Sequence, residues 1–202
     1  MASWTKIYML EEPKLEKPVL VQGLPGLGFV GKLTVTYLID ELKLKPFARL
    51  YSTHLTLLDG STGVHINSNG TFFLPKLEFY AYNQKKPNIV FLTGDTQPTV
   101  YGQYEVAERV VEVLGEFKVE KMFVLAGYGW DGPEVCCAAS NLKLIEEMKK
   151  FGLDTGYVGP FMGFSGLVFG MGILKNIDGI CLFGKTQPHP EKQEFPDTDA
   201  AK

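Results

Sequence analysis

The glycine-rich segment at residues 23–33 is the part of the sequence whose residue types and spacing come closest to a known chemistry. It reads GLPGLGFVGKL and lies between a short apolar run and a segment with helical periodicity. Gly26, Gly28 and Gly31 match the G-x-G-x-x-G pattern, in which glycines let backbone N–H groups approach a pyrophosphate. The acidic residue that should bind the ribose about 20 positions later is missing, because residues 46–49 read PFAR.

The same segment also fits the P-loop pattern G-x-x-x-x-G-K, which ends at Lys32. Leu33 follows where a P-loop has Ser or Thr to ligate magnesium, and an aliphatic side chain cannot ligate that ion. Three interpretations stay open: close backbone packing in a tight turn, a bound phosphate or small anion, and a dinucleotide site. Packing is favoured because such patterns often match by chance. The residues of this turn that would pack closely or bind an anion are Gly23, Pro25, Gly26, Gly28, Gly31 and Lys32.

Two further loops, at residues 93–98 and 127–132, each follow an apolar run that resembles a buried strand. The carboxyl ends of parallel strands meet at one edge of a sheet, so these loops and the glycine-rich turn should line one pocket. Aromatic residues there would serve equally well as anchors for a protein partner. The predicted pocket-rim or interface residues are Asp95, Gln97, Tyr101, Tyr128 and Trp130.

Other arrangements that could carry catalysis or bind a metal are weak. The string GFSGL at residues 163–167 lacks the final glycine of the nucleophile elbow G-x-S-x-G. Cys136 and Cys137 lie in a stretch of small and apolar residues that is typical of buried structural thiols. The histidines, His54, His65 and His189, are too far apart to suggest a ligand set. We therefore predict no catalytic residues, no metal site and no cofactor.

Composition limits the class of protein. A chain of 202 residues with 45% apolar residues fits a single α/β domain over residues 1–202. A net charge of −3 without a Lys/Arg block argues against nucleic-acid binding. Three cysteines and no secretion signal favour the cytoplasm. Residues 155–174 carry no charge over the length of a membrane span, but seven glycines and prolines interrupt them, so we expect a glycine-rich loop and helix and no membrane insertion.

The elements that would position the loops follow a repeated strand-then-helix pattern. Apolar runs at residues 19–21, 89–92, 122–125 and 180–183 predict the parallel centre of a sheet. Helical spacing predicts helices at residues 29–43, 104–117, 140–152 with Ser140 as N-cap, and 163–175. This alternation is the βαβ pattern of an α/β fold.

The rest of the chain predicts antiparallel additions. Residues 64–67 and 71–74 flank an Asn-Gly turn and should form a hairpin hung on the parallel sheet, followed by a half-exposed strand at residues 77–82. Residues 4–10 would add an edge strand. At the other end, Asp197 fits an N-cap, so we expect a C-terminal helix and tail truncated after residue 196.

Several strings together resemble one known family. They are VLVQGLPGLGFVGK at residues 19–32, FLTGDTQP at 91–98, AGYG at 126–129 and FMGFSGLVFGMG at 161–172. As a set they look like the proteasome assembly chaperone 2 family in its archaeal branch, and the first string is the most specific.

The resemblance implies a three-layer α/β/α sandwich similar to the phosphorylase/hydrolase-like folds, with a mostly parallel central sheet. It also implies a homo-oligomeric protein-binding chaperone whose partners are proteasome α-type subunits or related proteins, with no established catalytic residues. Some relatives end in a hydrophobic-Tyr-any tripeptide that docks on the proteasome, whereas this chain ends in Ala200, Ala201 and Lys202. The alternative is an enzyme or sensor that binds a nucleotide or phosphate at residues 26–32.

Overall fold

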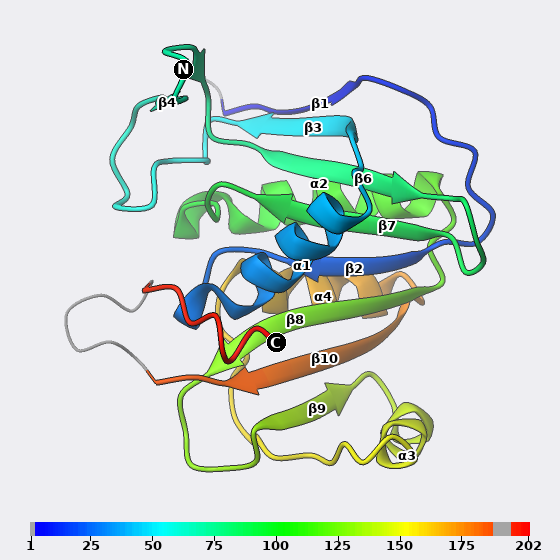
Figure 1. The fold of residues 1–202 in the computed structure, drawn as a ribbon. Coiled ribbons are helices and arrows are strands. Elements are labelled where there is room, and N and C mark those ends of the chain that lie inside the picture. Colours follow the sequence, from blue (N-terminus) through cyan, green and yellow to red (C-terminus); the bar gives the residue numbers. More distant parts are fainter. Residues whose placement is uncertain (1–2, 188–194) are drawn as a thin grey trace.

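The centre of the computed structural model, which describes residues 3–187 and 195–202, is an eight-stranded mixed sheet (Figure 1). The strands lie in the order β1-β3-β6-β7-β2-β8-β10-β9. Their bounds are Thr5–Met9 for β1, Val19–Gly23 for β2, Pro46–Ser52 for β3, Leu77–Tyr82 for β6, Ile89–Gly94 for β7, Lys121–Tyr128 for β8, Val135–Ala139 for β9 and Asp178–Lys185 for β10.

The four strands at the middle of the sheet are parallel, and they are the four predicted from apolar runs. β2 pairs with β7 on one side and with β8 on the other, and β8 pairs with β10. Val21 of β2 faces Phe91 and Phe123 in register on its two neighbours. Because both faces of these strands are covered, their apolar residues run almost without interruption.

Antiparallel strands extend this parallel centre on both sides. β6, β3 and β1 follow β7 in order, and β9 pairs with β10 at the opposite edge. The predicted strand at residues 77–82 and the predicted N-terminal edge strand are confirmed as β6 and β1. The antiparallel part is larger than expected, because β3 and β9 were not predicted.

The prediction that the hairpin of residues 64–74 joins the main sheet is wrong. Its strands β4 (His65–Ile66) and β5 (Phe72–Phe73) pair only with each other, in a separate two-stranded sheet. The tight turn forms as expected, with Gly70 at a φ of 80°. Two-residue strands whose Ile66 and Phe72 side chains stay exposed bury too little apolar surface to hold the hairpin against the sheet.

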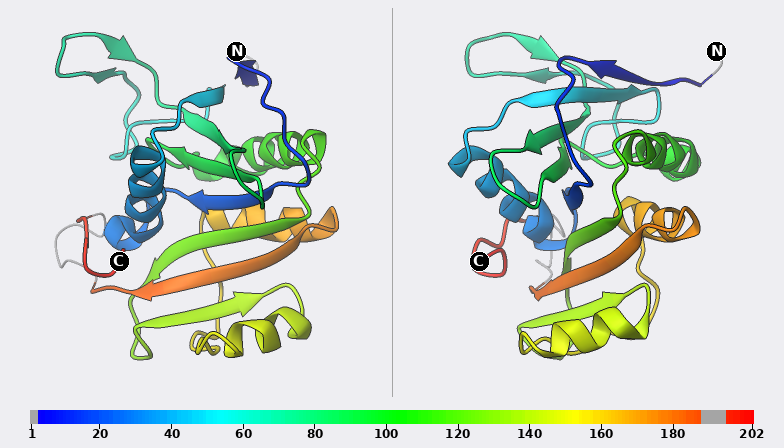
Figure 2. Two further views of the ribbon diagram at one scale, coloured as in Figure 1. Left: turned by 45° about the vertical axis from the view of Figure 1, so that its right-hand side comes forward. Right: turned by 90° about the vertical axis from the view of Figure 1, so that its right-hand side faces the viewer.

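Helices cover both faces and complete the three layers (Figure 2). Their bounds are Val30–Glu41 for α1, Gln103–Glu116 for α2, Leu142–Lys149 for α3 and Phe164–Leu174 for α4. Alternate residues of β8 point to opposite faces. Leu125 therefore packs in the cluster of α1, whereas Met122 packs in the larger core under α2 and α4. Phe123, on the same face as Leu125, packs against α3.

The four helices lie where the periodicity predicted them, with one corrected cap. Asn141, not Ser140, caps α3, because its side-chain oxygen accepts a hydrogen bond from the Leu144 backbone N–H at 3.1 Å. The Ser140 hydroxyl oxygen instead accepts one from the Gly179 backbone N–H at the start of β10. The charge-free segment at 155–174 forms a loop and α4. Within residues 3–187 and 195–202, no helix is long and apolar enough to cross a bilayer.

Candidate functional site

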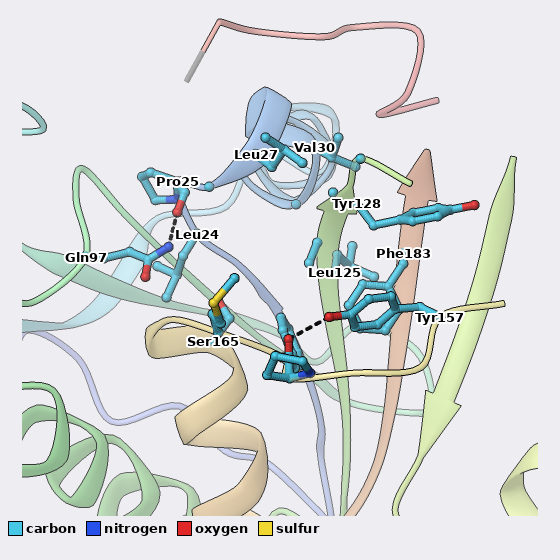
Figure 3. Close-up of a pocket in the computed structure, with 18 of the residues that line it drawn as sticks. Leu24, Pro25, Leu27, Val30, Gln97, Leu125, Tyr128, Tyr157, Ser165 and Phe183 are labelled. Atoms are coloured by element: carbon cyan, nitrogen blue, oxygen red, sulfur yellow. Dashed lines mark hydrogen bonds between the residues drawn. The ribbon is translucent and has the colours of Figure 1, made fainter. Parts of the chain in front are cut away.

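A cavity of about 400 Å³ opens at the carboxyl ends of β2 and β8 (Figure 3). The chain leaves β2 through α1 toward β3, and it leaves β8 toward β9 and β10 on the opposite side of the sheet. Neighbouring parallel strands whose connections diverge in this way leave a crevice between them, which is where ligands bind in open α/β sheets. The lining consists of Leu24, Pro25, Gly26, Leu27, Val30, Gly31, Gln97, Leu125, Ala126, Gly127, Tyr128, Gly129, Trp130, Tyr157, Pro160, Phe161, Met162, Ser165 and Phe183.

The glycines of the 23–33 turn bring α1 and the sheet into backbone contact. A Cβ at Gly31 would lie 2.0 Å from the carbonyl oxygen of Leu125, and one at Gly23 would lie 1.9 Å from the carbonyl oxygen of Gly31. Such distances are far inside van der Waals contact, so no larger side chain fits without a shift of backbone. These contacts support the close-packing interpretation of the motif.

Gly28 has a different requirement, because it adopts the left-handed conformation with a φ of 60°. Its carbonyl oxygen accepts a hydrogen bond at 2.8 Å from the backbone N–H of Asp197, in the C-terminal segment. The Asp197 carboxylate accepts a hydrogen bond from the Thr186 hydroxyl at 2.6 Å. The last residues of the chain therefore lie beside the start of α1, as Figure 1 shows in red.

Asp197 caps a single turn of backbone, as its predicted N-cap character suggests. Its carboxylate accepts hydrogen bonds from the backbone N–H groups of Asp199 and Ala200, at 3.2 and 3.0 Å. Residues 198–201 form a turn, not a helix. The Thr34 hydroxyl of α1 donates to the carbonyl oxygen of Ala201 at 2.8 Å, which adds a second attachment of this segment to α1.

Gln97 connects opposite sides of the cavity. Its side-chain amide donates a hydrogen bond to the carbonyl oxygen of Pro25 and accepts one from the Phe164 backbone N–H at 3.0 Å. Gly26, with an extended backbone at a φ of −177°, leaves room beside this amide, because a Cβ there would lie 3.7 Å from its nitrogen. The predicted pocket residue Gln97 thus joins the glycine-rich turn to the first residue of α4.

Aromatic side chains form the wall on the β8 and β10 side. The rings of Trp130 and Tyr157 are 4.9 Å apart between centroids, and Phe161 meets Phe183 edge to face at 5.0 Å. The Tyr128 hydroxyl donates to the carbonyl oxygen of Pro133. Trp130 remains 55% exposed, so it belongs both to the cavity wall and to the outer surface.

Lys32 and Asp95, in contrast, lie outside the cavity. The Lys32 ammonium donates a hydrogen bond to the carbonyl oxygen of Gly94 at 2.5 Å, and Asp95 pairs with Lys76 at 3.1 Å. Burial lowers the pKa of Lys32 below its ordinary value, and the nearby Asp95 carboxylate opposes this to a smaller degree. The Lys32 ammonium is therefore turned toward Gly94 and away from the cavity, unlike the phosphate-binding lysine of a P-loop.

The remaining predicted site residue, Tyr101, also lies outside the cavity lining and is 97% exposed. Six of the residues predicted from the sequence line the cavity together: Pro25, Gly26, Gly31, Gln97, Tyr128 and Trp130. Sequence reasoning missed Tyr157, Phe161, Ser165 and Phe183. The glycine-rich string at residues 161–172 was a signal for Phe161 and Ser165, because glycines allow a loop to approach a helix start closely.

The described cysteine, histidine, aspartate and glutamate side chains do not line the cavity. Cys136, Cys137 and Cys181 are buried and unpaired, and burial raises the pKa of each thiol. Over the two described ranges, no group of three His, Cys, Asp or Glu side chains could hold a metal ion. His189 lies outside the described residues.

A mixed eight-stranded sheet between two helical layers, with its cavity at the carboxyl ends of the parallel strands, defines a three-layer α/β/α domain. Comparison with known families identifies the family of this domain. The chain belongs to the PAC2 family, whose sequence model matches residues 20–202. The resemblance predicted from the sequence strings is thereby confirmed.

Individual relatives share most of the chain. An uncharacterized protein of Methanocaldococcus jannaschii is 33% identical over 181 residues, which cover 85% of this chain and 67% of that relative. The structure is similar to that of Pyrococcus furiosus PbaB, described as an archaeal proteasome activator, with a TM-score of 0.84 and 32% identity over 98% of this chain and 84% of PbaB. Pyrococcus furiosus PbaA, described as an archaeal homolog of proteasome-assembly chaperone, has a TM-score of 0.74 at 24% identity, covering 97% of this chain and 81% of PbaA. At that identity the likeness to PbaA shows a shared fold.

Proposed function

We propose that this protein is a homo-oligomeric, cytoplasmic chaperone that binds proteasome α-type subunits or related partners and has no enzymatic activity. The observation that carries the proposal is the likeness to PbaB, which extends over 98% of this chain at 32% identity. A match of both sequence and structure over nearly the whole chain favours a related role more strongly than a shared fold does.

A surface suited to protein contact lies around the cavity. Exposed apolar side chains project from the segments that follow β7 and β8 and from the loop that leads into α4. We call them the carboxyl-edge rim: Val100, Tyr101, Tyr104, Trp130, Val158 and Met162. Large apolar side chains exposed at one edge of a domain are typical of protein interfaces, and Tyr and Trp are frequent anchors there.

The lining of the cavity also favours binding over catalysis. Within the part of the chain that the structure describes, none of its side chains is an acid, a histidine, a lysine, an arginine or a cysteine. The hydroxyls of Tyr128 and Tyr157 are engaged with the carbonyl oxygens of Pro133 and Pro160. General acid–base and nucleophilic catalysis need a side chain placed to take or give a proton, and this lining offers few such groups.

The test is direct association. The chain and archaeal proteasome α-type subunits, mixed at about 20 µM each, should form a complex in native mass spectrometry if the dissociation constant is micromolar or lower. Sedimentation of the chain alone should give a mass above that of the 22.5 kDa protomer. Absence of a complex under these conditions would count against the partner, and a monomer would count against the homo-oligomer.

The alternative function is nucleotide or phosphate binding at residues 26–32. It has less support, because Lys32 is turned to Gly94 and Gly31 is in close contact with the Leu125 backbone. A thermal-shift screen distinguishes the two functions, since a ligand at 100 times its dissociation constant stabilises a fold by about 2.7 kcal/mol. A shift with nucleotides or phosphate, abolished by Lys32→Met, would favour the alternative.

A further inference from the structure

We propose that the cavity at the carboxyl ends of β2 and β8 binds a monocarboxylate with an apolar or aromatic body, its carboxylate held at the start of α4. This inference does not depend on the proteasome partner. The ligand would be a small free acid or the C-terminal residue of a peptide, which present the same chemistry.

Ser165, the second residue of α4, places a hydroxyl at the cavity. Its side chain lines the cavity, as Figure 3 shows, and the residue is only 8% exposed. Its hydroxyl makes no hydrogen bond within residues 3–187 and 195–202, although the side chains of Gln97 and Tyr157 in the same lining are bonded. The residue as a whole is buried while its hydroxyl is open to the cavity, so this free donor points to a ligand atom that accepts its hydrogen bond.

Ser165 lies at the N-terminal end of α4. The first backbone N–H groups of a helix have no partner inside it and form the positive end of its dipole. In α4 the N–H of Phe164 is bonded to Gln97, whereas the N–H groups of Ser165 and Gly166 have no partner among the described residues and can bind a ligand. Two N–H donors and one hydroxyl at a helix start match the two oxygens of a carboxylate.

The charge and the shape of the cavity also favour a monocarboxylate. Among the described residues, the cavity lining contains no Lys, Arg or His, so these residues offer no cation to balance the two charges of a phosphate. One negative charge suits the partial charge of a helix end better. The walls of Trp130, Tyr157, Phe161 and Phe183 supply apolar surface for a ring or an aliphatic chain, and a volume of about 400 Å³ is within the usual range for small-ligand sites.

The experiment titrates the full chain with four compounds: 3-phenylpropionate, N-acetylphenylalanine, N-acetylphenylalanine amide and inorganic phosphate. Calorimetry measures affinity, and ¹H–¹⁵N spectra locate the site. We expect at least one acid to bind with a dissociation constant of about 1 mM or below, and the neutral amide and phosphate to bind at least about tenfold more weakly. The acids should shift the amide resonances of Ser165 and Gly166.

Ser165→Ala should weaken binding of the acid by about tenfold, because it removes a hydrogen bond to a charged group. Ser68→Ala, on the exposed hairpin turn, is the matched control and should leave the affinity unchanged. If only N-acetylphenylalanine binds, the ligand is a peptide C-terminus, and if 3-phenylpropionate also binds, free acids are accepted.

Three results would overturn the proposal: no binding of either acid, equal affinity for the acid and its amide, or unchanged affinity in Ser165→Ala. The comparison of acid with amide uses the unaltered chain, so it stands even if the variant folds poorly.

Discussion

The side-chain oxygen of Gln97 lies 3.0 Å from the backbone nitrogen of Phe164 and accepts its hydrogen bond across 67 residues of sequence. The nitrogen of the same amide donates to the carbonyl oxygen of Pro25. One side chain therefore fixes the distance between the glycine-rich turn and the start of α4. Those two segments form opposite sides of the cavity, so the shape of the cavity depends on this amide.

Replacing Gln97 should loosen the start of α4. Gln97→Ala removes both hydrogen bonds, and we expect a loss of about 1–3 kcal/mol in the free energy of unfolding. Hydrogen exchange at the Phe164 amide should accelerate more than exchange elsewhere in α4. Gln84→Ala, at an exposed loop position, is the control and should change neither quantity. Unchanged protection of Phe164 in Gln97→Ala would contradict this role.

The contact between Gly31 and Leu125 predicts that two glycine-to-alanine variants differ strongly in their free energy of unfolding. Gly31→Ala places a Cβ 2.0 Å from a carbonyl oxygen and should cost about 3 kcal/mol, because backbone must move. Gly170 is exposed inside α4, and a Cβ added there would meet no atom of another segment within 4 Å. Gly170→Ala should therefore stabilise the protein by about 0.5–1 kcal/mol. Urea denaturation measures both. Similar values for the two variants would refute the packing explanation of the motif.

Lys32 should give stability a dependence on alkaline pH. Its pKa is lower in the folded state than the ordinary value of 10.5, because burial disfavours the ammonium. Between these two pKa values the unfolded chain binds more protons, so the stability of the unaltered protein rises with pH through that window. Relative to Lys32→Met, the unaltered protein should therefore gain stability as pH increases toward about 10.5.

Thermal unfolding of both proteins from neutral pH to that value tests the expectation. The exposed substitution Lys143→Met provides the control. If the difference in stability between Lys32→Met and the unaltered protein stays constant over this pH range, the effect of burial on the Lys32 pKa is contradicted.

Asp197 should hold the C-terminal segment on α1. Hydrogen bonds from the Thr186 hydroxyl, and then from backbone N–H groups, lower the pKa of Asp197 below its ordinary value of 3.8. The stability it provides is therefore present above pH 3.8 and is lost as the pH falls through its folded-state pKa. Asp197→Ala should cost about 1 kcal/mol at neutral pH, as loss of a capping residue does.

The attachment can be followed by the amide resonances of Gly28 and Thr34, which contact this segment. Asp197→Ala should shift both, whereas Asp199→Ala, whose side chain bonds only to the exposed Lys202 in the described structure, should shift neither. Equal effects of the two substitutions would argue against a specific role of Asp197.

The carboxyl-edge rim predicts a separation of partner binding from stability. Tyr101→Ala should leave the thermal midpoint unchanged, because the residue is 97% exposed. It should weaken the complex with the α-type subunit by about tenfold or more if Tyr101 is a contact anchor. Leu142→Ala is a matched control, because Leu142 is also exposed but lies near the amino end of β10. Its neighbour Asn141 donates a hydrogen bond to Asp178, the first residue of that strand. Equal affinity of the two variants would exclude Tyr101 from the interface.

The sequence by itself determined the parallel centre of the sheet, the four helices and the family. Buried parallel strands are read from uninterrupted apolar runs, and amphipathic helices from a period of 3.6 residues, so both signals are local. It also predicted that three loops meet in one pocket, since the carboxyl ends of parallel strands share an edge. Pro25, Gln97, Tyr128 and Trp130 were found in this way.

Only the tertiary structure decided which polar groups face the cavity. Nothing in the local sequence indicates the direction of the Lys32 and Ser165 side chains. A hydrogen bond to Gly94 holds Lys32 away from the cavity, whereas Ser165 lines the cavity and its hydroxyl has no partner among the described residues. The tertiary structure also decided the pairing of β3 and β9, because their partner strands are distant in sequence. The hairpin stays apart from the main sheet because it has too little apolar surface to join it. Side-chain direction and strand pairing follow from contacts between distant segments, and local periodicity does not encode those contacts.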